Sequence, residues 1–177
     1  VVYMQSEELK RLAEDIHRQR SERQTIELKA AHDGFPSKIY DTLSSFSNQD
    51  DGGILIFGMT DRPHYEIVGV YDAEDVQRRI MEACAQMEPR VRALITLCEI
   101  DGRMIVAAEV PGLAPAMRPV FYRGAGRLKG SYIRIGDADE RMTEYEIYSY
   151  EAFRQRIRDE LRPVEAAGPH GAQHRPA

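Results

Sequence analysis

Cysteine is scarce in this chain of 177 residues. Its two cysteines, Cys84 and Cys98, belong to no CxxC pair and have no histidine at metal-ligand spacing. We interpret them as free thiols of the core, which is typical of a reducing compartment. No segment reaches the roughly 18 apolar residues that a membrane span needs, and the N-terminus has no signal-peptide pattern. The expected protein is soluble and cytoplasmic, with no membrane contact.

Positive charge is also in short supply. Lys and Arg number 24 against 29 Asp and Glu, which gives a net charge of -5. This balance excludes the global cationic field that draws a protein onto DNA or RNA without specificity, so any such contact must come from a local patch. The sequence also contains no GxSxG, no GxGxxG and no Walker lysine loop, which argues against a serine hydrolase, a dinucleotide-binding fold and an ATPase.

The length and the hydrophobic content of 42% predict a single well-buried core. We divide the chain into an N-terminal helix (1–20), a domain (21–162) and a tail or linker rich in Pro, Gly and Ala (163–177). The tail has no periodicity and is expected to be disordered. Because the chain begins with Val, we expect it to be a piece of a longer polypeptide.

Hydrophobic periodicity predicts both helices and strands. Residues 54–59 are apolar without alternation, which indicates a central strand covered on both faces. Asp101-Gly102 separates two strand patterns and suits a two-residue hairpin. We predict an α+β (or α/β) fold: a mixed sheet of about five or six strands with helices on both faces. The expected helices cover residues 6–20, 34–48, 72–88 and 143–161, and the expected strands cover residues 25–29, 54–59, 66–70, 91–100, 103–110 and 132–135.

Local signals mark the ends and faces of these helices. Pro36 suits the first turn of the second helix, whose predicted buried face is Ile39, Leu43 and Phe46. Asp72 is the predicted N-cap of the third helix. Thr143 and Glu146 predict a capping box at the start of the last helix, which continues with an apolar stripe of Ile147, Tyr150, Phe153, Ile157 and Leu161.

Carboxylates flank the first predicted strands. Glu22, Glu27 and Asp61 are of the type that holds Mg²⁺ or Mn²⁺ at strand ends, and Lys29 could stabilise charge on a phosphate. The alternative is structural: Glu27 and Lys29 form a solvent-facing pair on an edge strand, and Asp61 belongs to a turn. The residues alone leave both interpretations open.

The turn at residues 48–53 contains consecutive glycines before the central strand. Its N–H groups could hold a phosphate oxygen, but Asp50 and Asp51 would repel an anion. A tight helix-to-strand connection is the favoured interpretation.

Residues 118–134 form the local basic patch that the overall charge requires. The segment has no acidic residue and interleaves cations with aromatic rings, a combination that neutralises phosphates and stacks on unpaired bases. The alternative is a solvated basic hairpin that binds nothing. The predicted nucleic-acid contacts are Arg118, Arg123, Arg127, Lys129 and Arg134, with Tyr122 and Tyr132 as stacking rings.

Taken in order, blocks of this sequence resemble the AlbA-like domain of the Schlafen family. The family pattern begins E-x-x-x-x-E-F-K, continues A-F-A-N-T-x-G-G-x-L-x-I-G-V-x-D, then I-V-G-V, and ends with a Pro and Y-x-R-x-G. The corresponding blocks here are residues 22–29, 45–61, 67–70, and Pro119 with residues 132–136. The similarity covers about residues 20–150 and depends on the order of the blocks more than on any one of them.

The resemblance implies an α/β fold that binds nucleic acid and, in bacteria, occurs in transcriptional regulators. The same domain was formerly described as a divergent AAA-type ATPase region. Some Schlafen proteins are metal-dependent ribonucleases with three acidic residues, which fall by motif position on Glu22, Glu27 and Asp61.

Our first hypothesis is therefore a DNA- or RNA-binding domain. The alternatives are a Mg²⁺- or Mn²⁺-dependent endoribonuclease, and an oligomerisation or scaffold module whose apolar surface meets a second copy of itself or a missing C-terminal segment. Only the nuclease needs a cofactor.

Overall fold

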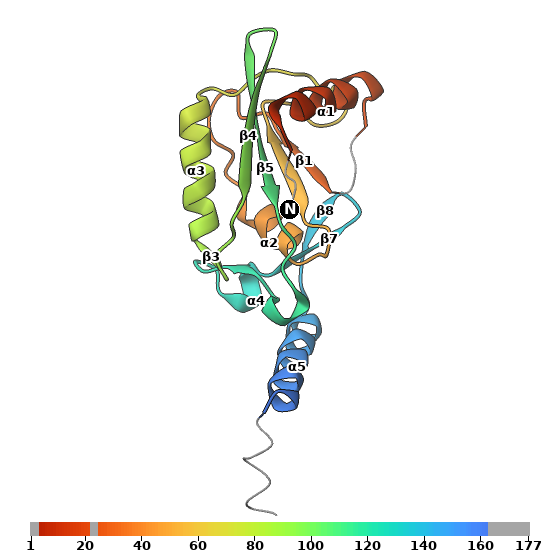
Figure 1. Cartoon of the computed structure of the whole chain (residues 1–177), viewed down its shortest axis with the longest axis vertical. Helices are drawn as coiled ribbons and strands as arrows, with labels where there is room; N and C mark the ends of the chain where they lie inside the picture. The colour runs from red at the N-terminus through yellow and green to blue at the C-terminus, as the bar shows by residue number, and fades with distance from the viewer. Residues whose placement is uncertain (1–3, 22–24, 163–177) are drawn as a thin grey trace, which may run out of the picture.

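A four-stranded mixed sheet forms the centre of the molecule. The computed structural model describes residues 4–21 and 25–162 (Figure 1). The strand order is β1-β2-β5-β4, with β1 parallel to β2 and the other neighbours antiparallel. These strands are β1 (Ile26–Lys29), β2 (Gly53–Phe57), β4 (Leu94–Ile100) and β5 (Arg103–Val110).

Helices cover both faces of this sheet, as the sequence predicts. On one face lies α1 (Ser6–Gln19), whose buried stripe of Leu9, Ala13 and Ile16 packs with Ile56. On the other lie α2 (Tyr40–Ser47) and α3 (Ala73–Ala85), which pack with Leu55. Because β2 contacts apolar side chains on both faces, it shows no polar alternation.

The hairpin between β4 and β5 is confirmed. Asp101 (φ 50°) and Gly102 (φ 78°) are both in the left-handed region that a two-residue turn of this kind requires. The N-cap predicted at Asp72 is also confirmed, because its carboxylate accepts a hydrogen bond of 3.1 Å from the amide of Asp75.

Residues 66–70 differ from the prediction, because they form no strand beside β2. A single bridge joins Met59 and Ile67, and the chain then crosses over the end of β2. The amides of Val68 and Gly69 both donate to the carbonyl of Gly58, and Val70 donates to Met104. The backbone groups of this segment are satisfied by these crossing contacts instead of a ladder.

Helix α2 begins later than the predicted start near Pro36. Residues 34–39 lead into it, and the ring of Phe35 stacks on Phe57 with centroids 5.9 Å apart. The predicted buried face of Ile39, Leu43 and Phe46 is confirmed.

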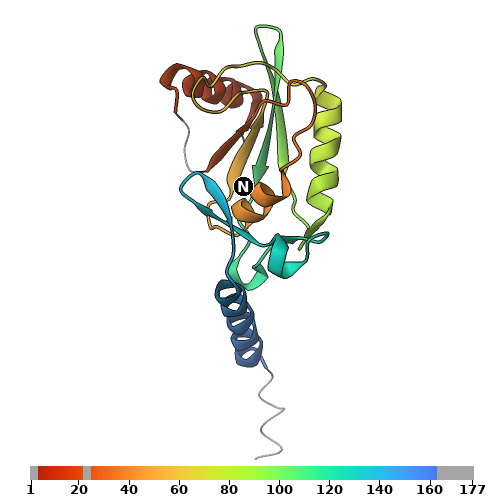
Figure 2. The same cartoon turned by 180° about the vertical axis from the view of Figure 1, so that it is seen from behind.

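The C-terminal part builds two small sheets and an outlying helix. β3 (Met87–Glu88) pairs with β6 (Phe121–Tyr122), and β7 (Tyr132–Ile135) pairs with β8 (Ala138–Arg141). The short helices η1 (Pro115–Met117) and α4 (Arg127–Gly130) lie at the same end of the molecule. From there α5 (Glu144–Glu160) extends away from the body, as Figures 1 and 2 both show.

The start of α5 carries the predicted capping box. The hydroxyl of Thr143 accepts from the amide of Glu146, and the Glu146 carboxylate accepts from the amide of Thr143. Only Ile147 is fully buried among the residues of this helix.

Both cysteines are free and buried, as predicted. Burial raises the pKa of each thiol to about 11, so neither is a thiolate at neutral pH. In the described parts of the chain, every helix is too short or too polar to span a lipid bilayer.

Candidate nucleic-acid interface

Arg134, one of the predicted phosphate contacts, lies inside the protein. Its side chain is 1% exposed and its guanidinium donates to two carboxylates, Glu27 and Asp139, each at 2.8 Å. The same guanidinium lies 5.0 Å from the ring centroid of Phe46. Burial alone would lower the pKa of Arg134, but the hydrogen bonds and charges of Asp139 and Glu27 raise it above its ordinary value.

Asp139 connects this ion pair to helix α2. Its carboxylate accepts from the hydroxyls of Thr42 (2.6 Å) and Ser45 (2.5 Å). Arg134 and Glu27 thus belong to a buried polar network that joins the edge strand β1, helix α2 and the β7–β8 hairpin. Such a network is costly to break, because each lost partner leaves a charge without compensation.

Arg118 is the second buried cation. Its side chain is 8% exposed, and it donates to the Asp50 carboxylate at 2.6 Å and to the Leu113 carbonyl at 2.9 Å. This contact uses one of the aspartates of the 48–53 turn.

At Gly52 (φ 63°), a Cβ would lie 2.1 Å from the Val110 carbonyl oxygen, so the glycine serves close backbone packing. The turn is the tight connection that the sequence favoured.

Asn48 is a structural residue whose role the sequence analysis missed. Its amide nitrogen donates to the carbonyls of Val120 (3.1 Å) and Tyr132 (2.9 Å), and its oxygen accepts from the amide of Val120 (2.7 Å). Ser44 adds a bond to each of the same two residues. The available signal was the pair of polar residues Ser44 and Asn48, four positions apart in a predicted helix, which in this fold both face the C-terminal segment.

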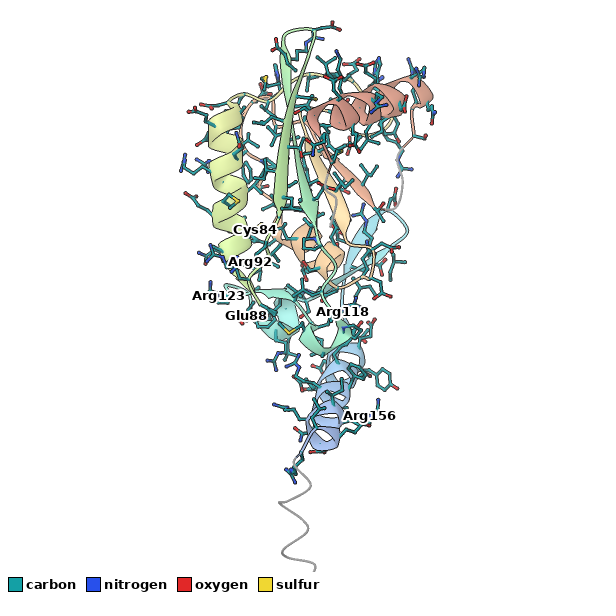
Figure 3. The ribbon with its side chains drawn as sticks, viewed as in Figure 1. Cys84, Glu88, Arg92, Arg118, Arg123 and Arg156 are labelled. Atoms are coloured by element: carbon teal, nitrogen blue, oxygen red, sulfur yellow. The ribbon has the colours of Figure 1, made fainter. Side chains whose placement is uncertain are left out.

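Three of the predicted cations are exposed: Arg123, Arg127 and Lys129, which we call the basic surface. Arg123 donates to the carbonyl of Ala85 at 2.5 Å, beside the end of α3. Arg127 pairs with Glu151 of α5 at 2.5 Å and lies 5.7 Å from the ring centroid of Phe121. Figure 3 labels Arg123 below α3 and Arg118 where the body meets α5.

The predicted stacking rings have protein contacts of their own. Tyr122 stacks on Tyr40 with centroids 3.8 Å apart and an interplanar angle of 11°. Burial, followed by the neighbouring Tyr122, raises the pKa of Tyr40. Gly124 lies so close that a Cβ there would be 2.4 Å from the Tyr122 ring. Tyr132 is half-buried, and its backbone is bonded to Ser44 and Asn48.

The carboxylates of the predicted metal site do not form a ligand group among the residues described. Glu27 is held by Arg134 at 2.8 Å and by Lys29 at 3.8 Å, while Asp61 is exposed in the turn that follows β2. In residues 4–21 and 25–162, no three His, Cys, Asp or Glu side chains are placed to hold a metal ion. Glu22 lies outside the described residues, so the complete trio stays a prediction.

A hollow of about 860 Å³ lies between α1 and the β4–β5 turn, at the end of the molecule opposite to the basic surface. The His17 and His32 rings line it, and each places Nδ1 against a backbone carbonyl oxygen, at 2.7 and 3.1 Å. Its lining contains equal numbers of cationic and acidic side chains, so it offers no field of one sign. They are Lys10, Arg18 and Arg103 against Glu14, Glu66 and Asp101.

Solved structures with this mixed fold include proteins of diverse length. The solution structure of the N-terminal domain of a RecG-related protein from Nitrosomonas europaea has a TM-score of 0.56 at 26% identity, over 75% of this chain and 92% of that one. The crystal structure of the DIP2311 protein from Corynebacterium diphtheriae has a TM-score of 0.52 at 19% identity. That match covers 82% of this chain but 28% of the other, and at this identity it shows the fold alone.

The fold and the ordered motifs define a mixed α+β domain of the AlbA-like class. The family model described as Schlafen, AlbA_2 matches residues 22–143. The chain therefore belongs to the Schlafen AlbA_2 family, which confirms the resemblance drawn from the motifs. No curated protein matches the sequence significantly.

Proposed function

We propose that this chain is a nucleic-acid-binding domain of a transcriptional regulator and that the basic surface contacts phosphates. The observation that carries the proposal is the exposure of Arg123, Arg127 and Lys129 at one end of the molecule, in a segment that contains no carboxylate. Exposed cations can exchange solvent, counterions and surface partners such as Glu151 for phosphate oxygens.

Arg118 and Arg134 have a different role in this proposal. Their guanidinium groups are held by Asp50, Glu27 and Asp139, and we assign them the task of fixing the ends of the basic segment. The loop between them is then presented in one conformation, which lowers the entropy lost on binding.

The family and one structural neighbour support a nucleic-acid-related role. The chain covers 92% of a domain from a protein related to the DNA helicase RecG, at 26% identity. The proposal includes both DNA and RNA, because phosphate contacts do not distinguish the two.

The test is a titration of labelled double-stranded DNA and of single-stranded DNA and RNA oligonucleotides, followed by fluorescence anisotropy over a range of salt concentrations. The wild-type chain should bind, with log affinity falling linearly against log salt. A variant with Arg123→Glu and Lys129→Glu should lose most of this affinity. The matched control is Lys10→Glu with Arg11→Glu, which makes the same charge change on exposed positions of α1, at the opposite end.

Equal losses in both double variants would show that only total charge matters and would contradict the assignment of the surface. Absence of binding by the wild-type chain at low salt would overturn the proposed function itself. Light scattering of the same samples would then show whether the chain associates with itself, as the scaffold alternative predicts.

A further inference from the structure

A hollow of about 490 Å³ lies where α4 meets α5, next to the basic surface. Arg127, the first residue of α4, lines one side of it. Tyr148, Glu151 and Arg158 are contributed by α5, at spacings that place them along one side of the helix. Since α5 points away from the body (Figure 1), this hollow continues the basic surface onto an exposed arm.

The charges around the hollow do not cancel. Arg127, Arg154 and Arg158 contribute three cations, whereas Glu151 is the only carboxylate among the lining residues. Arg154 is fixed by the carbonyls of Ala116 (3.1 Å) and Arg118 (2.6 Å), which are neutral acceptors. Arg158 donates to the neutral amide oxygen of Gln155 at 3.0 Å. The hollow therefore keeps an excess of positive charge that suits a phosphate.

Tyr148 adds a ring to this charge. Its exposed fraction is 53%, so a large part of the side chain is accessible to a ligand. By contrast, Tyr122 is already stacked on Tyr40. An accessible tyrosine beside arginines is the combination that single-stranded nucleic acids bind, because a base stacks on the ring while its phosphate is neutralised.

We propose that the α4–α5 hollow binds a nucleotide unit of a single strand, with its phosphate between Arg127 and Arg158 and its base on Tyr148. The proposal rests on the proposed function, which it extends from the α4 loop to α5. In the free protein the Glu151 carboxylate forms an ion pair with Arg127 at 2.5 Å, so it competes with the incoming phosphate for the same guanidinium. Binding exchanges this carboxylate for a phosphate oxygen.

Variants of α5 test the proposal by the same anisotropy titration. Arg158→Glu should weaken single-strand binding and reduce the salt slope by about 0.7, the value for one phosphate contact. The control Arg156→Glu makes the same charge change two residues away, at a position that does not line the hollow and whose guanidinium lies 5.9 Å from the Phe153 ring centroid (Figure 3). Its affinity should stay closer to that of the wild type.

Glu151→Gln gives the opposite sign. It removes the competing charge without removing the hydrogen-bonding capacity, so it should raise affinity severalfold. Tyr148→Ala should weaken binding of an ordinary oligonucleotide by about fivefold or more, and should have little effect on an abasic strand of the same length.

The outcomes distinguish a failure of the α4–α5 hollow from a failure of the proposed function. If the Arg123→Glu, Lys129→Glu variant loses affinity but Arg158→Glu does not lose more than Arg156→Glu, the hollow is not part of the binding surface, and the proposed function stands. Unchanged or lower affinity of the Glu151→Gln variant would also contradict the proposal that Glu151 competes with a phosphate for Arg127. If the wild-type chain binds no strand, both proposals fail.

Discussion

Residues 118–134 contain both buried arginines and exposed cations, and these two groups have opposite surroundings. Arg134 has a side chain that is 1% exposed and lies between two carboxylates. Arg127, seven positions earlier, is 45% exposed at its side chain. The same residue type thus holds the fold together at one position and is presented to solvent at the other. Charge density along a sequence does not reveal this division.

The comparison also separates what each region should do when it is changed. In the interior, removing one partner leaves a carboxylate without compensation, and the cost appears as lost stability. At the surface, a lost cation changes binding and its salt dependence, while the free energy of unfolding stays nearly the same.

The largest effect is expected for Arg134→Met. It leaves Asp139 without its cation and Glu27 with Lys29 alone, at 3.8 Å, and we expect the free energy of unfolding to fall by about 3 kcal/mol. Urea denaturation followed by circular dichroism measures it. The matched control is Arg123→Met, an exposed position where the change should stay within about 0.5 kcal/mol. Similar losses in the two variants would remove the distinction between the regions.

Asn48→Ala should have a smaller but clear effect. The substitution leaves the backbone groups of Val120 and Tyr132 without their side-chain partner, and buried groups of this kind cost about 1–3 kcal/mol in stability when they lose a hydrogen bond. The loss should appear in the same denaturation experiment. A nearly unchanged midpoint would mean that water or another group replaces the amide.

Exchange of the exposed cations should leave stability alone. We expect the Arg123→Glu, Lys129→Glu variant to unfold within about 0.5 kcal/mol of the wild type while losing strand affinity. A loss of several kcal/mol would place these residues with the buried group, and their effect on binding would then reflect unfolding.

The smallest effect is expected for added Mn²⁺. Because both oxygens of Glu27 face cations of the protein, we expect millimolar Mn²⁺ to leave the melting temperature unchanged, as ligand binding would otherwise raise it. A rise that Asp61→Asn abolishes would instead support the predicted carboxylate trio and the ribonuclease alternative. Asp61 is the better position for this control, since it is exposed and its substitution should not disturb the Arg134 network.

Local patterns predicted much of the fold correctly. The Asp101-Gly102 hairpin, the Thr143 capping box and the doubly covered strand β2 each depend on neighbouring residues, and all are confirmed. Residues 66–70 were predicted as a strand because the pattern shows the apolar spacing but not where the amides find acceptors. The acceptors are the carbonyls of Gly58, ten residues before Val68, and of Met104, 34 residues after Val70, and no local pattern identifies either of them.

The candidate site was harder to predict for the same reason. The partners of Arg134 are separated from it by 107 residues in one case and 5 in the other, and the more distant one, Glu27, is the residue that motif position assigned to a metal. Tyr148 and Arg158 were not singled out, because they belong to a helix whose sequence is explained by its apolar stripe. The ion pair of Arg127 with Glu151 and the hydrogen bonds of Arg154 to the carbonyls of Ala116 and Arg118 hold that helix beside the basic surface, and each of these contacts joins residues far apart in the sequence.

The most direct test of the distinction between buried and exposed arginines is an NMR titration. It follows the arginine side-chain Nε–H resonances as a single-stranded oligonucleotide is added. The account predicts shifts for Arg123 and Arg127, at the exposed end of the molecule, and little change for Arg118 and Arg134. Shifts of Arg134 with unmoved Arg123 and Arg127 resonances would contradict it, because the buried network would then be the part that meets the strand.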